Sequence, residues 1–202
     1  MCLLEKILIA KEEEYPIQGQ VFQNEILEEI AEEQLDFQNV KFERCRFVEC
    51  DFSKTSFVDV EFINCDFSNC ILKESYWRRG RVENCKGQGA NFTDGIFHQV
   101  EFLNTKLDYA NFNHTLLDDV VMRACTFVSS SIAEAKVKKL SLKENVFDHT
   151  DFFKTSLKGV DFTECEFTQV MLSDDYREIK GAKFNVFQAV DLAKLLGIIV
   201  EN

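Results

Sequence analysis

Apolar residues recur at every fifth position of the chain from Phe37 to Leu172, and the phase never changes. The series holds 28 consecutive five-residue units (pentads), of which 16 are centred on phenylalanine, and Gly87 is the one centre that is not apolar. A period of five matches neither an α-helix, at 3.6 residues, nor a β-strand, at 2.0. The pattern therefore predicts a repeating structural unit.

The position two residues before each centre is almost always small or β-branched, as at Val40, Cys45, Cys50 and Thr55. In an extended segment, residues i and i−2 point to the same side. Each pentad thus places one large and one small side chain inward, while its polar positions suit solvent and tight turns. Pentads of this kind predict a solenoid whose coils stack through parallel β-bridges.

The number of sides follows from the small inward position, where like residues recur at multiples of 20. Five cysteines lie on one 20-residue register: Cys45, Cys65, Cys85, Cys125 and Cys165. Five valines lie on another: Val40, Val60, Val100, Val120 and Val160. A 15-residue register would scatter both groups. Four pentads per coil predict an all-β, four-sided (quadrilateral) parallel β-helix of about seven coils over residues 35–174.

The two ends are expected to cap this rod. Residues 1–34 form the expected N-terminal capping segment, with two readings for residues 15–34. Ile17, Phe22 and Leu27 keep the five-residue phase, whereas Asn24 to Gln34 also fits a short helix with Asn24 as its N-cap.

Residues 175–202 form the expected C-terminal cap and dimerisation segment. A short helix is predicted from Asn185 to Gly197, with the glycine just past its end. The segment holds more apolar surface than one coil end can cover, which predicts a homodimer joined there. The expected dimerisation residues are Phe187, Val190, Leu195, Leu196, Ile198, Ile199 and Val200.

The formal net charge of −12 is unevenly distributed. Residues 1–34 hold nine acidic residues against two lysines. Within the rod, acidic residues exceed basic ones on the face centred on Phe52 and Leu72. An acidic rod is not expected to bind nucleic acid directly, but it can engage a protein surface that normally holds DNA. The expected target-binding residues are Asp51, Glu74, Asp94, Glu134, Asp151 and Asp174.

No catalytic motif or cofactor site is recognisable: the chain has no glycine-rich phosphate loop, HExxH motif or nucleophile elbow. The spacing of Cys45, Cys50, Cys65 and Cys70 is compatible with zinc, which leaves a zinc-dependent enzyme as a remote alternative. However, these cysteines share the small inward position with valine and alanine, and the three histidines face outward. We therefore expect no enzyme activity, no cofactor and no metal.

The first ten residues are too short and too charged for a secretory signal, and no apolar run approaches the length of a membrane span. A cytoplasmic protein without membrane contact is expected. The coil that contains Trp77-Arg78-Arg79-Gly80 and the Gly87 centre is the least regular, which indicates either a contact site or a packing kink.

Residues 35–174 resemble the pentapeptide-repeat proteins, and more narrowly the Qnr-type quinolone-resistance proteins. The narrower resemblance rests on three segments: Cys85-Lys-Gly-Gln-Gly-Ala-Asn-Phe92, Leu107-Asp-Tyr-Ala-Asn-Phe112, and the tail with Tyr176, Gln188 and Leu196-Gly197-Ile198. They are similar to the family's CRAQGADF, LSYANF and QASLLMERLGI segments. Several Qnr proteins carry loops that interrupt the pentads, whereas this chain has none and is closer to the loopless relatives.

The resemblance implies a right-handed β-helix that dimerises through its C-terminus and mimics DNA. It also implies binding to type II topoisomerases, DNA gyrase or topoisomerase IV, and their protection from fluoroquinolones. The alternative is a pentapeptide-repeat scaffold for an unknown protein partner.

Overall fold

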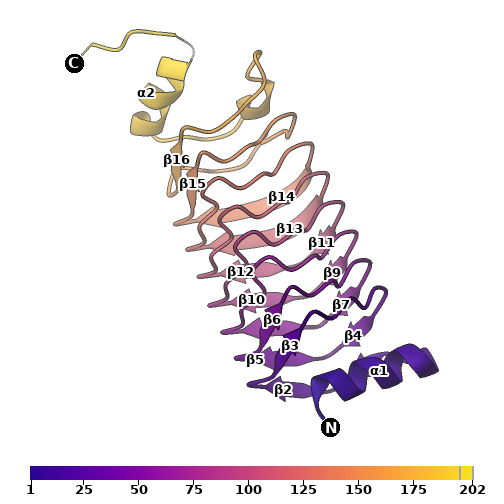
Figure 1. Cartoon of the computed structure of the whole chain (residues 1–202). Coiled ribbons are helices and arrows are strands. Elements are labelled where there is room, and N and C mark those ends of the chain that lie inside the picture. Colours follow the sequence, from indigo (N-terminus) through magenta and orange to yellow (C-terminus); the bar gives the residue numbers. More distant parts are fainter. Residues whose placement is uncertain (196, 202) are drawn as a thin grey trace.

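The computed structural model describes residues 1–195 and 197–201 and forms a four-sided β-helix closed by a helix at each end (Figure 1). Paired residues are almost always 20 positions apart, as in Phe37 with Phe57 and Phe42 with Phe62. All of the strand pairs are parallel. The predicted all-β, four-sided parallel β-helix is therefore confirmed.

We name the four sides faces A, B, C and D, after the pentads centred on Phe37, Phe42, Phe47 and Phe52, respectively. The faces differ in how many of their residues lie in regular strands. Face D is joined by single bridges that run from Ala31↔Asp51 to Asp151↔Met171. Face A holds β1 (Ile17–Gln18), β4 (Asp36–Gln38), β7 (Ser56–Val58), β9 (Tyr76–Arg78) and β11 (Ile96–His98). Face B holds β2 (Val21–Gln23), β5 (Lys41–Glu43), β8 (Glu61–Ile63), β10 (Arg81–Glu83) and β12 (Glu101–Leu103). Face C holds β3 (Ile26–Glu28), β6 (Arg46–Val48), β15 (Val146–Asp148) and β16 (Glu166–Thr168).

Two long strands, β13 (Leu116–Arg123) and β14 (Lys136–Lys143), run around the corner between faces A and B. Most other corners are formed by a residue with φ near +50° to +60°, such as Asn39, Asn64 and Asn84. Asparagine and glycine adopt this left-handed conformation most readily. The polar positions of the pentads thus provide both the turns and the outer surface.

The core is a column of large side chains stacked along the axis of the rod. Phe42 stacks on Phe62 with ring centroids 4.7 Å apart, and Phe92 stacks on Phe112 at 4.6 Å. Trp77 belongs to the same column: it is 2% exposed and stacks on Phe57 at 4.2 Å. The coil expected to be the least regular is therefore regular.

The small inward positions explain the cysteine content. All seven cysteines of the pentads are buried and free. On face C their thiols donate weak hydrogen bonds to a carbonyl of the preceding coil, as Cys65 Sγ does to Phe42 O at 3.4 Å. Thr105 and Asn145 occupy the same column and donate in the same direction. Cysteine thus serves here as a small side chain with a weak donor.

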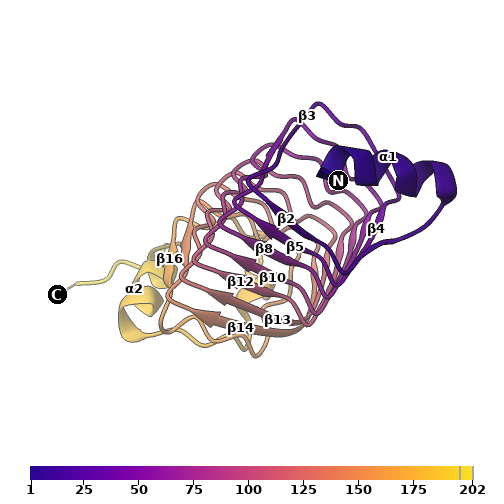
Figure 2. The same cartoon turned by 90° about the horizontal axis from the view of Figure 1, so that it is seen from below.

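Residues 1–34 comprise a helix and one further coil. The helix α1 (Leu3–Glu13) lies across the open end of the rod and buries Leu3 and Ile7 against the core (Figure 2). The coil starts at Ile17, which pairs with Phe37, so the β-helix has about eight turns where the regular series predicts about seven. Asn24 is a left-handed corner residue (φ 56°), so of the two readings for this segment the coil is the correct one.

The C-terminal end is closed by a 3₁₀ turn (Arg177–Ile179), by Phe184, which stacks on Phe162, and by α2 (Val186–Leu195). Asn185 caps α2 by accepting the amide of Phe187 at 3.0 Å, and Gly197 adopts φ 75° after its end. The Gln188 side chain anchors α2 by donating to Phe162 O at 2.8 Å. The predicted C-terminal helix is confirmed. No helix among residues 1–195 and 197–201 is long and apolar enough to cross a membrane.

The buried carboxylate of Glu178 makes this cap sensitive to acid. Glu178 is 1% exposed, accepts the amide of Lys154 at 2.8 Å and accepts the Ser173 hydroxyl at 2.9 Å. Burial alone would raise the pKa of this carboxyl, but the hydrogen bonds from Ser173 and from backbone amides hold it below its ordinary value. The ionised form is therefore the one that fits the cap.

Because the pKa of Glu178 is lower in the folded than in the unfolded chain, its contribution to stability is complete above about pH 4.5. It is lost as the pH falls through the folded-state pKa. We expect the Glu178→Gln variant to be about 1–3 kcal/mol less stable at neutral pH and to show a smaller loss on acidification. Urea unfolding at pH 7 and at pH 4 measures this, with Glu201→Gln as the control. Parallel pH profiles for the wild type and Glu178→Gln would contradict the assignment.

Candidate functional site

The outer surface is organised in columns, because each outward residue lies beside the residue 20 positions later. The corner between faces D and A carries Lys54, Glu74, Asp94, His114, Glu134 and Lys154, whose positive φ values project their side chains from the rod. Glu74 and Asp94 are exposed on consecutive coils. Glu134 lies in the same column but forms an ion pair with Lys154 at 3.7 Å.

Two of the expected target-binding residues have local partners in the fold. Asp51 and Asp151 lie on face D itself and are only half-exposed. Asp51 accepts the Ser53 amide at 2.9 Å, and Asp151 accepts the Phe153 amide at 2.8 Å. These bonds stabilise turns, so both carboxylates are oriented by the backbone.

The six expected target-binding residues therefore do not form one cluster. Asp51 and Asp151 lie on face D, Glu74, Asp94 and Glu134 lie on its corner with face A, and Asp174 is exposed beyond the last regular coil. Glu74 and Asp94 are the pair that the fold brings together on neighbouring coils.

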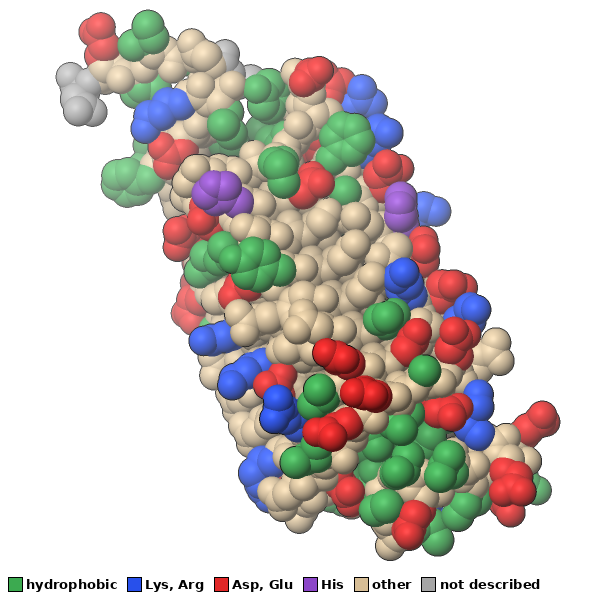
Figure 3. Space-filling view, viewed as in Figure 1, with side chains coloured by type: hydrophobic (Ala, Val, Ile, Leu, Met, Phe, Trp, Pro, Cys, Tyr) green, Lys and Arg blue, Asp and Glu red, His purple; other side chains and the backbone are tan. Residues whose placement is uncertain are grey.

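Two further acidic corner residues lie on the opposite edge of face D. Glu29 (φ 52°) and Glu49 (φ 51°) occupy the corner between faces C and D on consecutive coils, and both are exposed. Among the described residues, neither these two nor Glu74 or Asp94 forms an ion pair. We call these four residues the acidic rim. Figure 3 shows acidic side chains gathered over the N-terminal half of one face of the rod.

Glu29 and Glu49 were not among the predicted site residues. Glu29 belongs to the segment expected to form a cap, and Glu49 lies outside the pentads of face D. The signal was present, since Ile17, Phe22 and Leu27 keep the five-residue phase. Applying that phase places Glu29 one coil before Glu49 in the same corner column.

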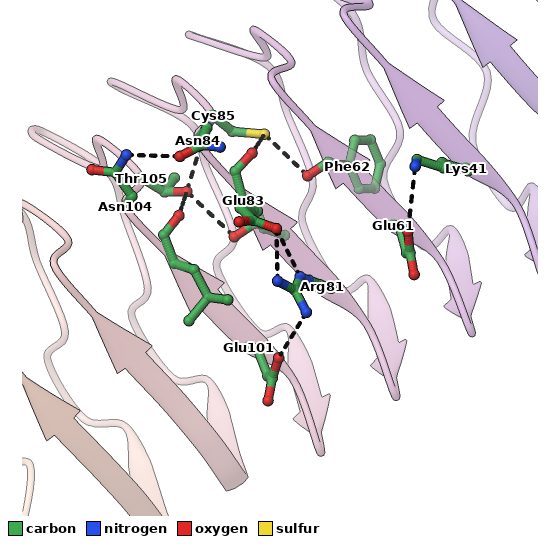
Figure 4. A network of polar contacts seen from close by, with 12 residues as sticks. Lys41, Glu61, Phe62, Arg81, Glu83, Asn84, Cys85, Glu101, Asn104 and Thr105 are labelled. Atoms are coloured by element: carbon green, nitrogen blue, oxygen red, sulfur yellow. Dashed lines mark hydrogen bonds and ion pairs between the residues drawn. The ribbon is translucent and has the colours of Figure 1, made fainter.

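Face B carries a ladder of alternating charge (Figure 4). Lys41 Nζ lies 4.0 Å from Glu61 Oε2, and Arg81 Nη1 lies 3.9 Å from Glu101 Oε2. Arg81 also binds Glu83 at 2.8 Å. Opposite charges on neighbouring strands neutralise one another, so face B presents little net charge.

Some basic side chains of face A and of its corner with face B are also paired. Arg79 binds Asp59 through two hydrogen bonds, which lower the pKa of the Asp59 carboxyl. Lys138 lies 3.1 Å from Asp118. A surface hollow of about 410 Å³ is lined by Tyr76, Arg78, His98, Gln99, Asp118 and Asp119. Several charges on faces A and B are thus paired locally, in contrast to the acidic rim.

The buried Cys125 thiol is in an environment that favours its protonated, unreactive form. Burial raises the pKa of Cys125 to about 11, so its thiolate is scarce at neutral pH. The part of the chain that the structure describes has no group of three or more His, Cys, Asp or Glu side chains arranged to hold a metal ion.

We expect the rod to keep its melting temperature in a thiol reductant and in EDTA, because packing alone holds the cysteine columns. The Cys65→Ala variant should lose only about 1–2 kcal/mol of unfolding free energy, since it removes one small buried group. Thermal melting followed by circular dichroism measures both effects. Unfolding by EDTA would instead indicate a structural metal.

Comparison with known proteins identifies the repeat. Residues 35–112 match the family model described as "Pentapeptide repeat region", and the same period continues to Leu172. The predicted pentapeptide repeat is thereby confirmed for residues 35–112. No protein with a curated description matches the chain.

Two solved structures illustrate the fold. A trypsin-treated QnrB1, described as a plasmid-mediated fluoroquinolone resistance protein, is 23% identical over 93% of this chain and 100% of its own, with a TM-score of 0.49. HetL from Nostoc sp. strain PCC 7120, described as a pentapeptide repeat protein involved in heterocyst differentiation regulation, is 14% identical over 91% of this chain and 94% of its own, with a TM-score of 0.56. At 14% identity the likeness to HetL shows the fold alone.

Proposed function

We propose that this chain is a non-catalytic, DNA-mimicking protein that binds a type II topoisomerase, DNA gyrase or topoisomerase IV, and protects it from fluoroquinolones. The observation that carries the proposal is the acidic rim. Glu29, Glu49, Glu74 and Asp94 lie on two parallel edges of one face, on a rigid rod, without ion-pair partners among the described residues. Regularly spaced carboxylates of this kind suit a basic surface that normally holds DNA phosphates.

The corner geometry adds support. Left-handed φ values disfavour glutamate relative to asparagine or glycine, yet Glu29, Glu49 and Glu74 adopt them. The same conformation recurs at most corners of the rod, including Lys54, Arg79 and Ala124, so it is a property of the coil. Its effect at the acidic rim is to project these carboxylates from the rod.

The test is gyrase supercoiling with and without ciprofloxacin, across a titration of the protein. Reversing the charge of the acidic rim (Glu29→Lys, Glu49→Lys, Glu74→Lys and Asp94→Lys) should weaken inhibition and protection by at least about tenfold. The matched control reverses Glu12, Glu13, Glu14 and Glu201, which are exposed at the two ends of the chain. Binding of the wild type should also weaken as salt rises.

Equal effects of the rim and control variants would reject the acidic rim as the contact surface. No effect of the wild-type protein on either topoisomerase would reject the target. That second result favours the alternative function, an interaction scaffold with another protein partner. HetL, which shares the fold, is described as involved in heterocyst differentiation regulation, so the fold is compatible with this alternative.

The same proposal includes a homodimer formed through the C-terminal segment, in the cytoplasm. Phe187 is 80% exposed, Ile199 87% and Ile198 53%, so α2 and the tail present an uncovered apolar surface. Leu195 and Val200 are also exposed, Val190 is half-buried, and Leu196 lies outside the described residues. Exposed apolar surface of this kind is typical of subunit interfaces.

Light scattering tests the dimer. The wild type should be a dimer at micromolar concentration, and Phe187→Glu with Ile199→Glu should be a monomer with an unchanged circular dichroism spectrum. Tyr109→Glu, on the side of the rod, is the control, because Tyr109 is 66% exposed but distant in sequence from the tail. A monomeric wild type would exclude this part of the proposal.

A further inference from the structure

Within the described residues of the rod, the β-helix ladder is interrupted between β14 and the coil that follows it. Every other corner between faces A and B, from Asn39 to Asp119, has a left-handed residue, but Lys139 does not. The register shifts there, so that Asp118 pairs with Lys139, one position out of phase. Leu140 occupies the next small inward position, where this column otherwise holds valine or glycine, and its bulk accounts for the straightened corner.

The straightened strand leaves its outer edge without a backbone partner. β14 pairs with β13, but among the described residues no backbone hydrogen bond joins Lys136–Lys143 to residues 156–163. The ladder resumes on both sides of this opening, where Glu134 donates to Phe153 O at 2.8 Å and Glu144 to Glu164 O at 3.1 Å. The backbone groups of β14 that would bind the next coil are therefore unsatisfied by protein.

Side chains along this edge are also less covered than their equivalents. Val137, Leu140 and Leu142 are half-buried. The residues one coil earlier in the same columns, Leu117, Val120 and Met122, are each 1% exposed. These three apolar residues of β14 are thus partly exposed to solvent.

The two chain segments that flank the opening are basic. β14 carries Lys136, Lys138, Lys139 and Lys143, and residues 156–163 add Lys158 against Asp161. The excess is four positive charges, in a chain whose net charge is −12. Lys138 and Lys139 also contact Asp118 and Asp119 of the preceding strand, while Lys143 contacts Glu144 and Glu164. The edge is the most basic stretch of the rod.

We propose that the edge of β14 is a second binding surface, which receives an extended acidic segment of a partner protein as an added parallel or antiparallel strand. Main-chain hydrogen bonds to the free edge would provide affinity. Apolar side chains of the segment would cover Val137 and Leu142, and alternating carboxylates would meet the lysines. This surface lies on faces A and B and is distinct from the acidic rim.

The probe is a fluorescein-labelled peptide of alternating glutamate and valine, about six residues long, the length of an average strand. We expect its fluorescence anisotropy to rise on titration with the full-length protein. The same peptide with N-methylated valines, which cannot donate main-chain hydrogen bonds, should bind at least about tenfold more weakly. A lysine–valine peptide should not bind.

Protein variants locate the site. Lys136→Glu with Lys138→Glu should weaken peptide binding by at least about tenfold, whereas Lys86→Glu with Lys106→Glu should not. The control lysines are exposed and belong to a fully bridged part of face C. In hydrogen exchange, the amides of Val137 and Leu142 should exchange faster than those of Leu117 and Met122, and peptide should slow them.

Three results would overturn the proposal. The first is equal binding of the normal and N-methylated peptides, which indicates charge attraction alone. The second is slow exchange of Val137 and Leu142 in the free protein, which indicates a closed edge. The third is absence of peptide binding combined with self-association of the Lys136→Glu, Lys138→Glu variant, because the lysines then only prevent edge-to-edge aggregation.

Discussion

Replacing Trp77 with alanine is expected to lower the free energy of unfolding by about 3–5 kcal/mol, among the largest effects of any single change in the rod. Trp77 is 2% exposed and stacks between Phe57, at 4.2 Å, and Phe97, at 5.8 Å. A cavity at this site would interrupt the column on both sides. Urea unfolding followed by circular dichroism measures the change.

The Trp77→Phe variant separates packing from hydrogen bonding. Trp77 Nε1 donates to Ser75 Oγ at 2.8 Å, while Ser75 itself donates to Leu72 O at 2.6 Å. Phenylalanine keeps most of the stacking and leaves Ser75 with its own acceptor, so we expect a loss of only about 1–2 kcal/mol. If Trp77→Ala cost no more than Trp77→Phe, the stacked column would not be the source of stability here.

Replacing Gly87 with leucine, which would complete the apolar series, is expected to destabilise the rod by about 1–3 kcal/mol or more. A Cβ atom at Gly87 would overlap the Phe67 ring and lie 3.0 Å from Leu107 Cδ2. Neighbouring side chains already fill the space that a regular centre would occupy. The repeat pattern alone would predict that leucine at this position stabilises the rod.

A second substitution tests whether Phe67 and Gly87 share one packing site. Phe67→Ala alone should be destabilising, because it leaves a cavity beside Gly87. Combined with Gly87→Leu, it should recover part of the loss, because the new side chain enters the vacated space. Thermal melting of the two single variants and the double variant forms the cycle. Additive losses would show that Phe67 and Gly87 do not share one packing site.

The repeat period made most of the fold predictable from the sequence. The 20-residue recurrence of cysteine and valine identified four sides, and the Asn185 to Gly197 pattern identified α2. The helix α1 was not identified, because Leu3 and Ile7 are the only two of its residues that are buried and they contact the end of the column. A contact made by two residues at the end of the column leaves no periodic pattern in the sequence.

The candidate site was less predictable because it depends on pairing between columns. Sequence spacing placed Glu74, Asp94 and Glu134 in one column, but only the structure shows that Lys154 neutralises Glu134. Likewise, Asp51 and Asp151 belong to an acid-rich face in the sequence. The structure shows that both carboxylates accept backbone amides within turns. One residue in the sequence indicates the irregular corner at Lys139: Leu140 is large, whereas this column otherwise holds valine or glycine. The regularity of the other pentads makes this exception easy to overlook.

The exact 20-residue register restricts how this chain can change in length during evolution. Inserting or deleting one pentad would keep the core pattern, but it would rotate every later surface residue by a quarter turn around the rod. Losing a pentad between Glu74 and Asp94, for example, would move these carboxylates to different corners while the fold survived. Any selected function that needs several coils to present one surface therefore permits length changes only in whole coils, whereas a purely structural rod would tolerate single pentads.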